Sequence, residues 1–419
     1  MSGTRVLVAG ASIAGPALAH WLRRRGAEVT VVERAPGLRP GGQAVDARGV
    51  AKEIIRRMGL DAAVRAACTQ TVGAHTVDAD GNVLQTYRAD DDGGDGYIAE
   101  IEILRGDLSQ VLHDDTRDGV EYLFGDRIAE LSQDADGVDV LLAGGERRRF
   151  DLVIGADGLH SALRTMVFGP RERFVRHLGL VLAFYSVPNE FGLDRWFLEC
   201  QEAGRSAGLR PIQDATRAMA LFSFAAADFD VDHRDVTAQK QLLRERLAGF
   251  GWLAPRILAH LDDTPDFYLD QVAQVVMDRW SSGRVGLLGD AAFSPSPMSG
   301  QGTGLALVGA YLLAGELAAS GWDPVAGFAG YEARMRPFVE ANQEMGRMHA
   351  RSVAVSEPNA GPDPDPEPEP DMESLMELVE RALHGVELPD YAGVPDSGLL
   401  RGSRGASAGS PVTSSTTRP

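Results

Sequence analysis

The chain of 419 residues contains very little cysteine. Its only two cysteines, Cys68 and Cys200, do not have the spacing of a metal site or of a redox motif. The nine histidines are scattered along the chain, again without metal-ligand spacing. Disulfide frameworks and zinc sites require cysteine or histidine residues at characteristic spacings. We therefore expect no metal site, no disulfide framework and a reducing compartment.

Positive charge and long apolar runs are also scarce. The formal net charge is -19 at pH 7, so the surface should repel nucleic acid and anionic membranes. No apolar run reaches the roughly 18 residues that suggest a membrane span, and the chain does not begin with a basic segment followed by an apolar stretch. We expect a cytoplasmic protein, monomeric or homodimeric, that acts on a small molecule and has no nucleic-acid or membrane partner.

Glycine, in contrast, is abundant, with 48 residues, and several glycines fall between an apolar strand and a helix. The apolar segment 5–9 is predicted to be a buried strand, 17–25 a helix and 28–33 a second strand. This pattern predicts a complete βαβ unit.

The turn of this unit carries a glycine motif. Gly10 to Gly15 matches G-x-G-x-x-G, except that Ser12 replaces the second glycine. Glu33 lies 23 positions after Gly10, close to the offset of about 20 residues expected for a carboxylate that accepts ribose hydroxyls. In this context the motif predicts dinucleotide binding, with the pyrophosphate at the helix N-terminus.

Two segments with strand-like alternation interrupt the α/β pattern, and the first is a predicted hairpin around Asp80-Gly81-Asn82 followed by a loop over 90–96. The length also favours two domains. We expect an α/β fold, in which a discontinuous Rossmann-like domain carries an inserted β-rich substrate domain. The nucleotide-binding domain is expected at 1–71, 97–177 and 279–355, the substrate domain at 72–96 and 178–278, and an acidic proline-rich spacer, a short helix (372–384) and a flexible tail at 356–419.

Two further apolar strands end in a carboxylate. The segment 151–154 leads into Asp157-Gly158, and 284–288 leads into Gly289-Asp290. A Pro/Gly loop and a long apolar helix over 305–319 follow Asp290. Asp290 is suited to bind a ribityl hydroxyl, and the loop N–H groups are suited to the pyrimidine edge of a flavin, where reduction builds negative charge.

These three motifs, in this order and spacing, resemble the flavin-dependent aromatic hydroxylases with the para-hydroxybenzoate hydroxylase fold. That group includes tetracycline-inactivating and polyketide-tailoring monooxygenases. The resemblance spans roughly residues 4–355, and Asp157-Gly158 together with Gly289-Asp290 is distinctive of the family. It implies that FAD is bound on its ADP-ribose side by Gly10, Ser12, Ile13, Ala14, Gly15, Glu33 and Arg34. It further implies cofactor contacts for Gln43, Arg48, Arg105, Asp157, Gly158, Asp290, Pro297, Gly300, Gln301 and Gly302.

The mechanism that the resemblance implies needs few catalytic side chains. NAD(P)H reduces FAD, the reduced flavin reacts with O₂ to give a C4a-hydroperoxide, and its distal oxygen hydroxylates a bulky aromatic or polyketide-like molecule. Pro297 and Met298 are expected near the reacting flavin face, and Asp157 also near the transient nicotinamide.

Three departures from the family pattern are expected near the flavin. Phe293 stands where many relatives have His, Thr303-Gly304 replaces a residue followed by Asn, and Gly309-Ala310 replaces Asp-Ala.

Aromatic residues of the β-rich insert are candidate substrate contacts, namely Phe184, Trp196, Phe222 and Phe224. Alternation places Phe222 and Phe224 on one face of their strand and Leu221 and Ser223 on the other. The sequence does not decide which face lines the pocket.

Two alternatives stay open. The same fold could support epoxidation, Baeyer–Villiger oxidation or dehydrogenation, because a fold does not determine a reaction. The altered positions around Phe293 also leave open a protein that binds flavin or another ligand without turnover.

Overall fold

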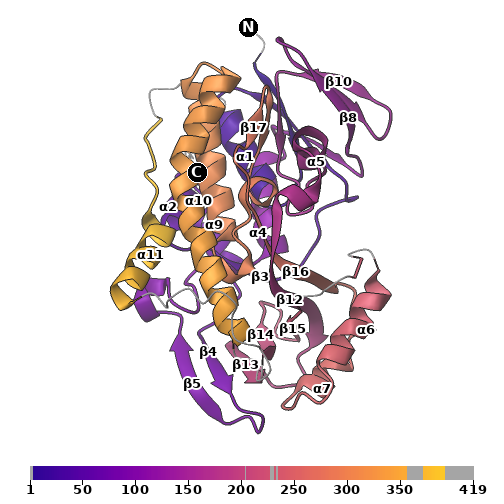
Figure 1. The fold of residues 1–419 in the computed structure, drawn as a ribbon, viewed down its shortest axis with the longest axis vertical. Coiled ribbons are helices and arrows are strands. Elements are labelled where there is room, and N and C mark those ends of the chain that lie inside the picture. Colours follow the sequence, from indigo (N-terminus) through magenta and orange to yellow (C-terminus); the bar gives the residue numbers. More distant parts are fainter. Residues whose placement is uncertain (1–2, 203, 227–230, 233–234, 356–370, 392–419) are drawn as a thin grey trace, which may run out of the picture.

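The computed structural model describes residues 3–202, 204–226, 231–232, 235–355 and 371–391. Two large sheets organise the chain, one in the upper half of Figure 1 and one in the lower half, with the long helices α9 and α10 running along one side. The acidic spacer at 362–370 and the tail at 401–419 lie outside the described residues.

The upper sheet has six strands in the order β17-β18-β11-β1-β2-β7, and all its pairings are parallel except that of the edge strand β17. Its central strands are continuous apolar runs because both faces are covered, as in other parallel sheets. The predicted βαβ unit is confirmed as β1, α1 (Ala14–Arg24) and β2. The strands are β1 (Arg5–Ala9), β2 (Glu28–Glu33), β7 (Glu121–Phe124), β11 (Leu152–Gly155), β17 (Ser281–Ser282) and β18 (Val285–Leu287).

Helices pack against this sheet and against each other, with α1 on α9 and α9 on α10. By length and composition α9 (Gly302–Ala319) could cross a membrane, so the expectation that no apolar run reaches about 18 residues was too strict. However, 83% of α9 is buried inside the protein, which accounts for its apolar composition. The 32-residue helix α10 (Pro324–Val355) was not predicted. The other helices of this half are α2 (Val50–Met58), α3 (Asp61–Ala66), α4 (Arg105–Thr116), α5 (Ala162–Phe168) and α8 (Asp290–Phe293).

The lower sheet has seven strands in the order β16-β12-β15-β14-β13-β4-β5. The predicted hairpin is confirmed as β4 and β5, which join this sheet although about 90 residues separate them from the next of its strands. Helices α6 (Val236–Arg246) and α7 (Ala254–Leu258) cover one face and form a second core with it. The strands are β4 (Gly73–Val77), β5 (Val83–Arg88), β12 (Val175–Pro188), β13 (Trp196–Glu202), β14 (Arg205–Pro211), β15 (Arg217–Ala225) and β16 (Tyr268–Val275).

Two small sheets complete the fold. One pairs β3 (Ala44–Asp46) with β6 (Glu102–Leu104), and the other joins β8 (Ile128–Gln133), β9 (Val138–Leu142) and β10 (Arg147–Phe150). Three short 3₁₀ helices are η1 (Asp91–Gly94), η2 (Arg171–Arg173) and η3 (Pro297–Ser299). The first lies in the stretch expected to be a simple loop at 90–96, so that expectation is corrected.

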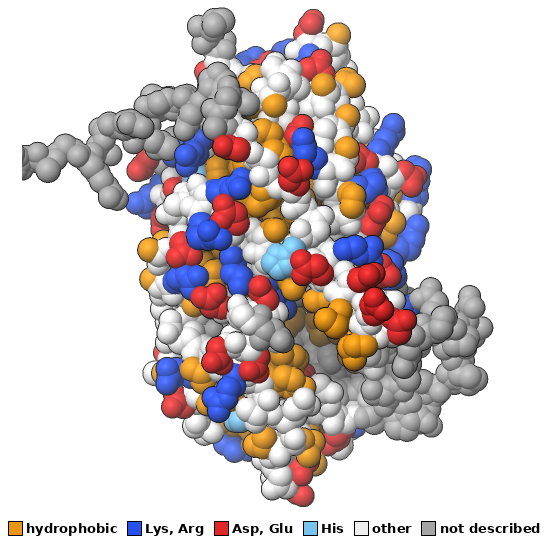
Figure 2. All heavy atoms as spheres, turned by 90° about the vertical axis from the view of Figure 1, so that its left-hand side faces the viewer, with side chains coloured by type: hydrophobic (Ala, Val, Ile, Leu, Met, Phe, Trp, Pro, Cys, Tyr) orange, Lys and Arg blue, Asp and Glu red, His pale blue; other side chains and the backbone are white. Residues whose placement is uncertain are grey.

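The C-terminal helix α11 (Met372–His384) forms where it was predicted and packs back onto α10. Leu378 and Ala382 join a small core with α10, and the Asn342 side-chain amide donates to the Ala382 carbonyl at 3.0 Å. Beyond the helix, the Tyr391 hydroxyl donates to Glu316 Oε1 at 2.6 Å. On the face that Figure 2 shows, positive and negative side chains are interspersed, although the whole chain is strongly acidic.

Replacing Phe222 by Ala should destabilise the protein by about 3–5 kcal/mol, because the side chain is 1% exposed and the substitution leaves a cavity in the core beneath α6 and α7. Thermal unfolding followed by circular dichroism should show a lower Tm. The control is Leu84→Ala, since Leu84 is 69% exposed and should change little. Equal Tm values for the two variants would contradict this account of the core.

Candidate active site

The candidate site lies where the parallel strands β1, β2, β11 and β18 end. In the sheet, β1 pairs with β2 and β11, and β11 pairs with β18, all in parallel. Their carboxyl ends therefore meet at one edge, which is the usual ligand-binding edge of such sheets. The three sequence motifs begin at this edge, because each directly follows one of these strands.

The Gly10–Gly15 turn has backbone geometry that requires glycine at both ends. Gly10 has φ +110°, and a Cβ atom there would collide with the Ala156 carbonyl oxygen. A Cβ on Gly15 would collide with the Gly10 carbonyl. No described side chain caps the N-terminus of α1, so its backbone N–H groups are available to a ligand. The departure at Ser12 is accommodated, with its hydroxyl oxygen 3.5 Å from that of Ser109.

Glu33 is held in place at the end of β2. Its Oε2 accepts from the Ala11 N–H at 2.9 Å, and its Oε1 accepts from the Ala35 N–H at 2.9 Å. The carboxylate thus lies directly beside the glycine turn, where the ribose of a bound dinucleotide would be. Arg34 next to it is exposed.

Asp157 has a structural role in addition to any role at the cofactor. Its carboxylate accepts from the Ser161 hydroxyl at 2.5 Å and from the N–H groups of Ala162 and Leu163 at 2.8 and 3.1 Å. It therefore stabilises the N-terminus of α5. Gly158 follows with φ +79°.

Asp290 borders the space between the strand edge and the seven-stranded sheet, which we call the hollow. The residue is exposed to this space, but the surrounding protein limits the hydration of its carboxyl and raises its pKa above the usual value, whereas Arg105 acts to lower it. Gly302, the first residue of α9, lies close by, since a Cβ atom there would be 3.9 Å from Asp290 Oδ1. No described side chain caps α9, and no acidic residue stands in its first turn.

Arg105 connects the motifs across the hollow. Burial, followed by the nearby Arg39, lowers the pKa of the Arg105 guanidinium. The carboxylates Glu33 and Asp290 act in the opposite direction, because they favour its charged form. Its N–H donates to the Gln43 carbonyl at 3.0 Å, and the Gly106 N–H donates to the Gly41 carbonyl at 2.8 Å. The segment before β3 is thereby held against the start of α4.

The loop between α8 and α9 contains the other predicted cofactor residues. Pro297 is exposed, Met298 is half-buried and Gln301 is buried. Gly300 has φ +65° and lies against Arg48, because a Cβ atom there would be 2.9 Å from one terminal nitrogen of that guanidinium.

Two of the three departures from the family pattern, at Phe293 and Gly309, lie in the core. Phe293 is 1% exposed and packs against Trp280, with ring centroids 4.7 Å apart. A Cβ atom on Gly309 would lie 2.9 Å from Leu288 Cδ1 and 3.4 Å from the Phe293 ring, so Gly309 is closely packed in the same core. Gly304 similarly leaves room for the Gln301 side chain. The expectation that these positions lie near the flavin stays a prediction, and the structure places Phe293 and Gly309 in the core.

Two of the four substrate candidates belong to the core. Phe222 and Phe224 are each 1% exposed and lie in the core beneath α6 and α7, on the side of the sheet away from the cofactor residues. Their expected role in the pocket wall is corrected, because the alternation of β15 points them at those helices. Trp196 stacks on His75 of β4, with centroids 4.2 Å apart.

Phe184 lies on the opposite face, which we call the inner face of the seven-stranded sheet. It pairs across strands with Leu221 and Tyr268, and its ring lies 6.2 Å from that of Tyr268. Tyr268 is 46% exposed, and both Arg105 and Asp290 influence its pKa, which burial raises. The inner face therefore borders the cofactor residues.

Sequence reasoning missed the residues that join the two sheets. Tyr268 donates to Asp270 Oδ2 at 3.1 Å, and His160 Nε2 lies 2.6 Å from the same oxygen. His160 belongs to the Asp157 motif, whereas Asp270 is on β16. Tyr268 and Asp270 are two positions apart, as residues on one face of a strand are. This spacing was the signal available in the sequence, but only the fold shows that the two side chains face the hollow.

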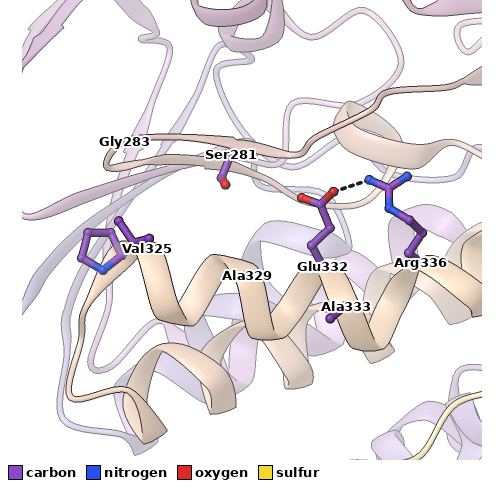
Figure 3. A pocket seen from close by; sticks show the side chains of 8 residues that line it. Ser281, Gly283, Val325, Ala329, Glu332, Ala333 and Arg336 are labelled. Atoms are coloured by element: carbon purple, nitrogen blue, oxygen red, sulfur yellow. Dashed lines mark hydrogen bonds and ion pairs between the residues drawn. The ribbon is translucent and has the colours of Figure 1, made fainter.

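A separate surface hollow lies between the β17–β18 turn and the start of α10 (Figure 3). Its charged side chains are already paired. The Glu332 carboxylate accepts a hydrogen bond from the Arg336 guanidinium and another from the backbone N–H of Trp280, the latter at 3.0 Å. None of the motif residues lines it, so it is not the cofactor site.

The residues at the strand edge fit FAD. The glycine turn and α1 would hold the pyrophosphate, Glu33 the ribose, and Asp290 the ribityl chain. The N–H groups at the start of α9 would face the pyrimidine edge of the isoalloxazine. A side chain at Gly10 or Gly15 would collide with backbone carbonyl groups and so disrupt the turn that forms this site.

Comparison with known proteins agrees with this fit. The profile of the family described as FAD binding domain matches residues 3–345. An uncharacterized protein of Mycobacterium tuberculosis (strain ATCC 25618 / H37Rv) is 45% identical over 387 residues, which cover 92% of this chain and 99% of that protein. A flavin-dependent monooxygenase of Legionella longbeachae is 38% identical over 396 residues, covering 92% and 98%. The crystal structure of tetracycline destructase Tet(55) has a TM-score of 0.79 at 38% identity, covering 93% and 99%.

The fold and the site thus define an FAD-binding flavoprotein with the para-hydroxybenzoate hydroxylase fold. The chain belongs to the FAD binding domain family and is an FAD-dependent monooxygenase. This membership overturns the alternative of a binding protein without turnover.

Replacing Asp290 by Asn should stabilise the cofactor-free protein at neutral pH and weaken FAD binding. Because the pKa of Asp290 is raised in the folded state, the ionised carboxylate opposes folding at neutral pH. This cost disappears as the pH falls below the unfolded pKa of about 3.9. FAD binds more weakly because an amide is a poorer acceptor for a hydroxyl than a carboxylate.

The measurement is the Tm of the cofactor-free wild type and variant from neutral to acidic pH, followed by FAD titration. The variant should have the higher Tm at neutral pH, and the difference should narrow in acid. Asp118→Asn is the control, since the Asp118 side chain is 92% exposed. A Tm difference that does not depend on pH would refute the assignment.

Proposed function

We propose that this monooxygenase uses NAD(P)H and O₂ to insert one oxygen atom into a bulky aromatic or polyketide-like molecule. The balanced reaction is RH + O₂ + NAD(P)H + H⁺ → ROH + NAD(P)⁺ + H₂O. Bound FAD would supply hydride acceptance and oxygen activation, which protein side chains cannot provide. The proposed place of action is the cytoplasm, as a monomer or homodimer.

The proposal rests mainly on the position of the inner sheet face. Tyr268 lies near Arg105 and Asp290, and the Phe184 ring lies 6.2 Å from that of Tyr268, so a flat apolar substrate would lie between the sheet and the isoalloxazine. Aromatic walls favour stacking on such a substrate. The relatedness to a tetracycline destructase supports a multi-ring compound.

The protein's own contribution in this proposal is positioning and exclusion of water. The α9 N-terminus and the glycine-rich loop before it would stabilise negative charge at the pyrimidine edge. Asp290, Glu33 and Arg105 would orient the cofactor from the strand edge. The inner face would keep the substrate dry and close to the reacting atoms, which limits loss of the activated oxygen.

A spectroscopic experiment tests the proposal. The purified protein should be yellow or take up added FAD, its visible bands should bleach on anaerobic addition of NADPH, and they should return in air. Protein stripped of flavin is the control. A colourless protein that takes up no FAD, or bound flavin that NADPH does not reduce, would count against the proposal.

Isotope labelling separates the possible reactions. With a substrate found by stimulated NAD(P)H oxidation, ¹⁸O₂ should place one labelled hydroxyl oxygen on carbon. Label in an ester or an epoxide would indicate Baeyer–Villiger oxidation or epoxidation instead. A product without label would indicate dehydrogenation.

A further inference from the structure

The loop between α8 and α9 is held at its start by two buried glutamines. Gln274 of β16 is 1% exposed, and Gln343 of α10 is 6% exposed. Glutamine is mostly an exposed residue, and its amide is buried only where hydrogen bonds satisfy it. The bonds that these two amides make therefore show which part of the backbone they hold.

Both amides donate to carbonyl groups where the loop begins. The Gln274 amide donates to the Pro295 carbonyl at 3.0 Å and to the Gln343 carbonyl at 2.7 Å. The Gln343 amide donates to the Val275 carbonyl at 2.8 Å and, more weakly, to the Ser294 carbonyl at 3.4 Å. Because all four acceptors are carbonyl oxygens, the amide nitrogens must face them. Strand β16, helix α10 and the loop are thereby joined at one point.

Helix α10 stays against the loop for two further turns. A Cβ atom on Gly346 would be 2.4 Å from the Pro295 carbonyl oxygen, so the helix backbone touches the loop there. His349 Nδ1 lies 2.9 Å from the Met298 carbonyl oxygen and donates to it. Residues three positions apart on a helix are neighbours on its surface, so one side of α10 supports the first half of the loop.

The backbone of the loop is strained at the point that the glutamines hold. Ser296 has φ +77° and ψ 156°, a conformation found almost only in glycine, which persists where surrounding contacts enforce it. The peptide unit before Ser296 carries the Pro295 carbonyl, which is the acceptor of Gln274. A trans peptide unit directs its N–H opposite to its C=O, so the Ser296 N–H is directed away from β16 and α10. The glutamines thus set the direction in which the rest of the loop continues.

We propose that Gln274 and Gln343 are positioning residues of the monooxygenase reaction. They fix the segment 294–296, and through it they direct the N–H groups between Pro297 and the start of α9 toward the pyrimidine edge of the isoalloxazine. Both glutamines act through the loop backbone and touch neither cofactor nor substrate. The inference deepens the proposed function at the same site, and it rests on that function only in assigning this loop to the flavin.

The expected effect is on the reduced state of the cofactor. Reduction builds negative charge at the pyrimidine edge, and N–H donors in the correct place stabilise that charge. Donors that lose their place stabilise reduced FAD less, whereas the contacts to the pyrophosphate and the ribose are untouched. The midpoint potential should therefore fall, while oxidised FAD should still bind.

Gln343→Met and Gln274→Met test the proposal on the FAD-loaded protein. Methionine is a flexible side chain of similar length, but it has no N–H donor. Reduced FAD should lose about tenfold more affinity than oxidised FAD, the effect of weakening one hydrogen bond to a charged group. For a two-electron couple, this change lowers the midpoint potential by about 30 mV. The potential is measured by stepwise reduction with dithionite against a reference dye, and the affinity for oxidised FAD by titration of the cofactor-free protein.

Gln239→Met is the matched control. Gln239 of α6 is 3% exposed, and its amide donates to the Asp232 carbonyl at 3.1 Å, on the side of the sheet away from the cofactor residues. This variant should lower the Tm without changing the midpoint potential. His349→Ala removes a donor to the loop at an exposed position, where folding should be unaffected. It should lower the potential in the same direction as the glutamine variants.

Two kinds of result would overturn the proposal. An unchanged potential in the glutamine variants, or an equal shift in Gln239→Met, would mean that the glutamines only stabilise the fold. A more positive potential would mean that the N–H groups of the loop do not serve the reduced flavin. Should neither glutamine variant fold, His349→Ala is judged by the same criteria. Because dithionite replaces NAD(P)H and no substrate is present, these results are independent of whether the proposed hydroxylation occurs.

Discussion

The backbone contact between the Gly10–Gly15 turn and the end of β11 is the constraint on which the cofactor site depends. Gly10 approaches the Ala156 carbonyl, and Gly15 approaches Gly10, so closely that neither position admits a Cβ atom. This contact brings the N-terminus of α1 to the edge where β1, β11 and β18 end. Glu33, Asp157 and Asp290 reach the same edge because β2, β11 and β18 all run parallel to β1.

Charged and hydrogen-bonding side chains join this edge to the seven-stranded sheet. Arg105 lies within electrostatic reach of Glu33, Asp290 and Tyr268, so it belongs to both halves of the site. The contact of His160 with Asp270 links the motif after β11 to β16. The hollow is thus formed by residues from several distant segments, as is common where catalysis needs groups of different chemistry.

Packing also explains the positions at which the chain departs from its relatives' pattern. Phe293 and Gly309 both lie within the core, and Gly304 makes room for Gln301. Sequence reasoning treated these positions as changes at the flavin because they neighbour cofactor residues along the chain. Neighbours along a helix point to different sides, so adjacency in sequence does not place a side chain in the site.

Much of the local structure was predictable. The βαβ unit, the hairpin β4–β5, the helix α11 and the three motifs were all read from local periodicity and turn residues, which act over a few positions. Three features were not predictable, because they depend on contacts between distant segments. They are the long helix α10, the pairing of β4 with β13 and the face of β15 that borders the hollow. Phe222 and Phe224 illustrate the limit, since alternation shows that they share a face but not what covers it. The sequence by itself determined the nucleotide-binding turn and the carboxylates at the strand ends. Only the tertiary structure decided which residues surround the substrate space, because that space is bounded by strands that meet only when the chain is folded.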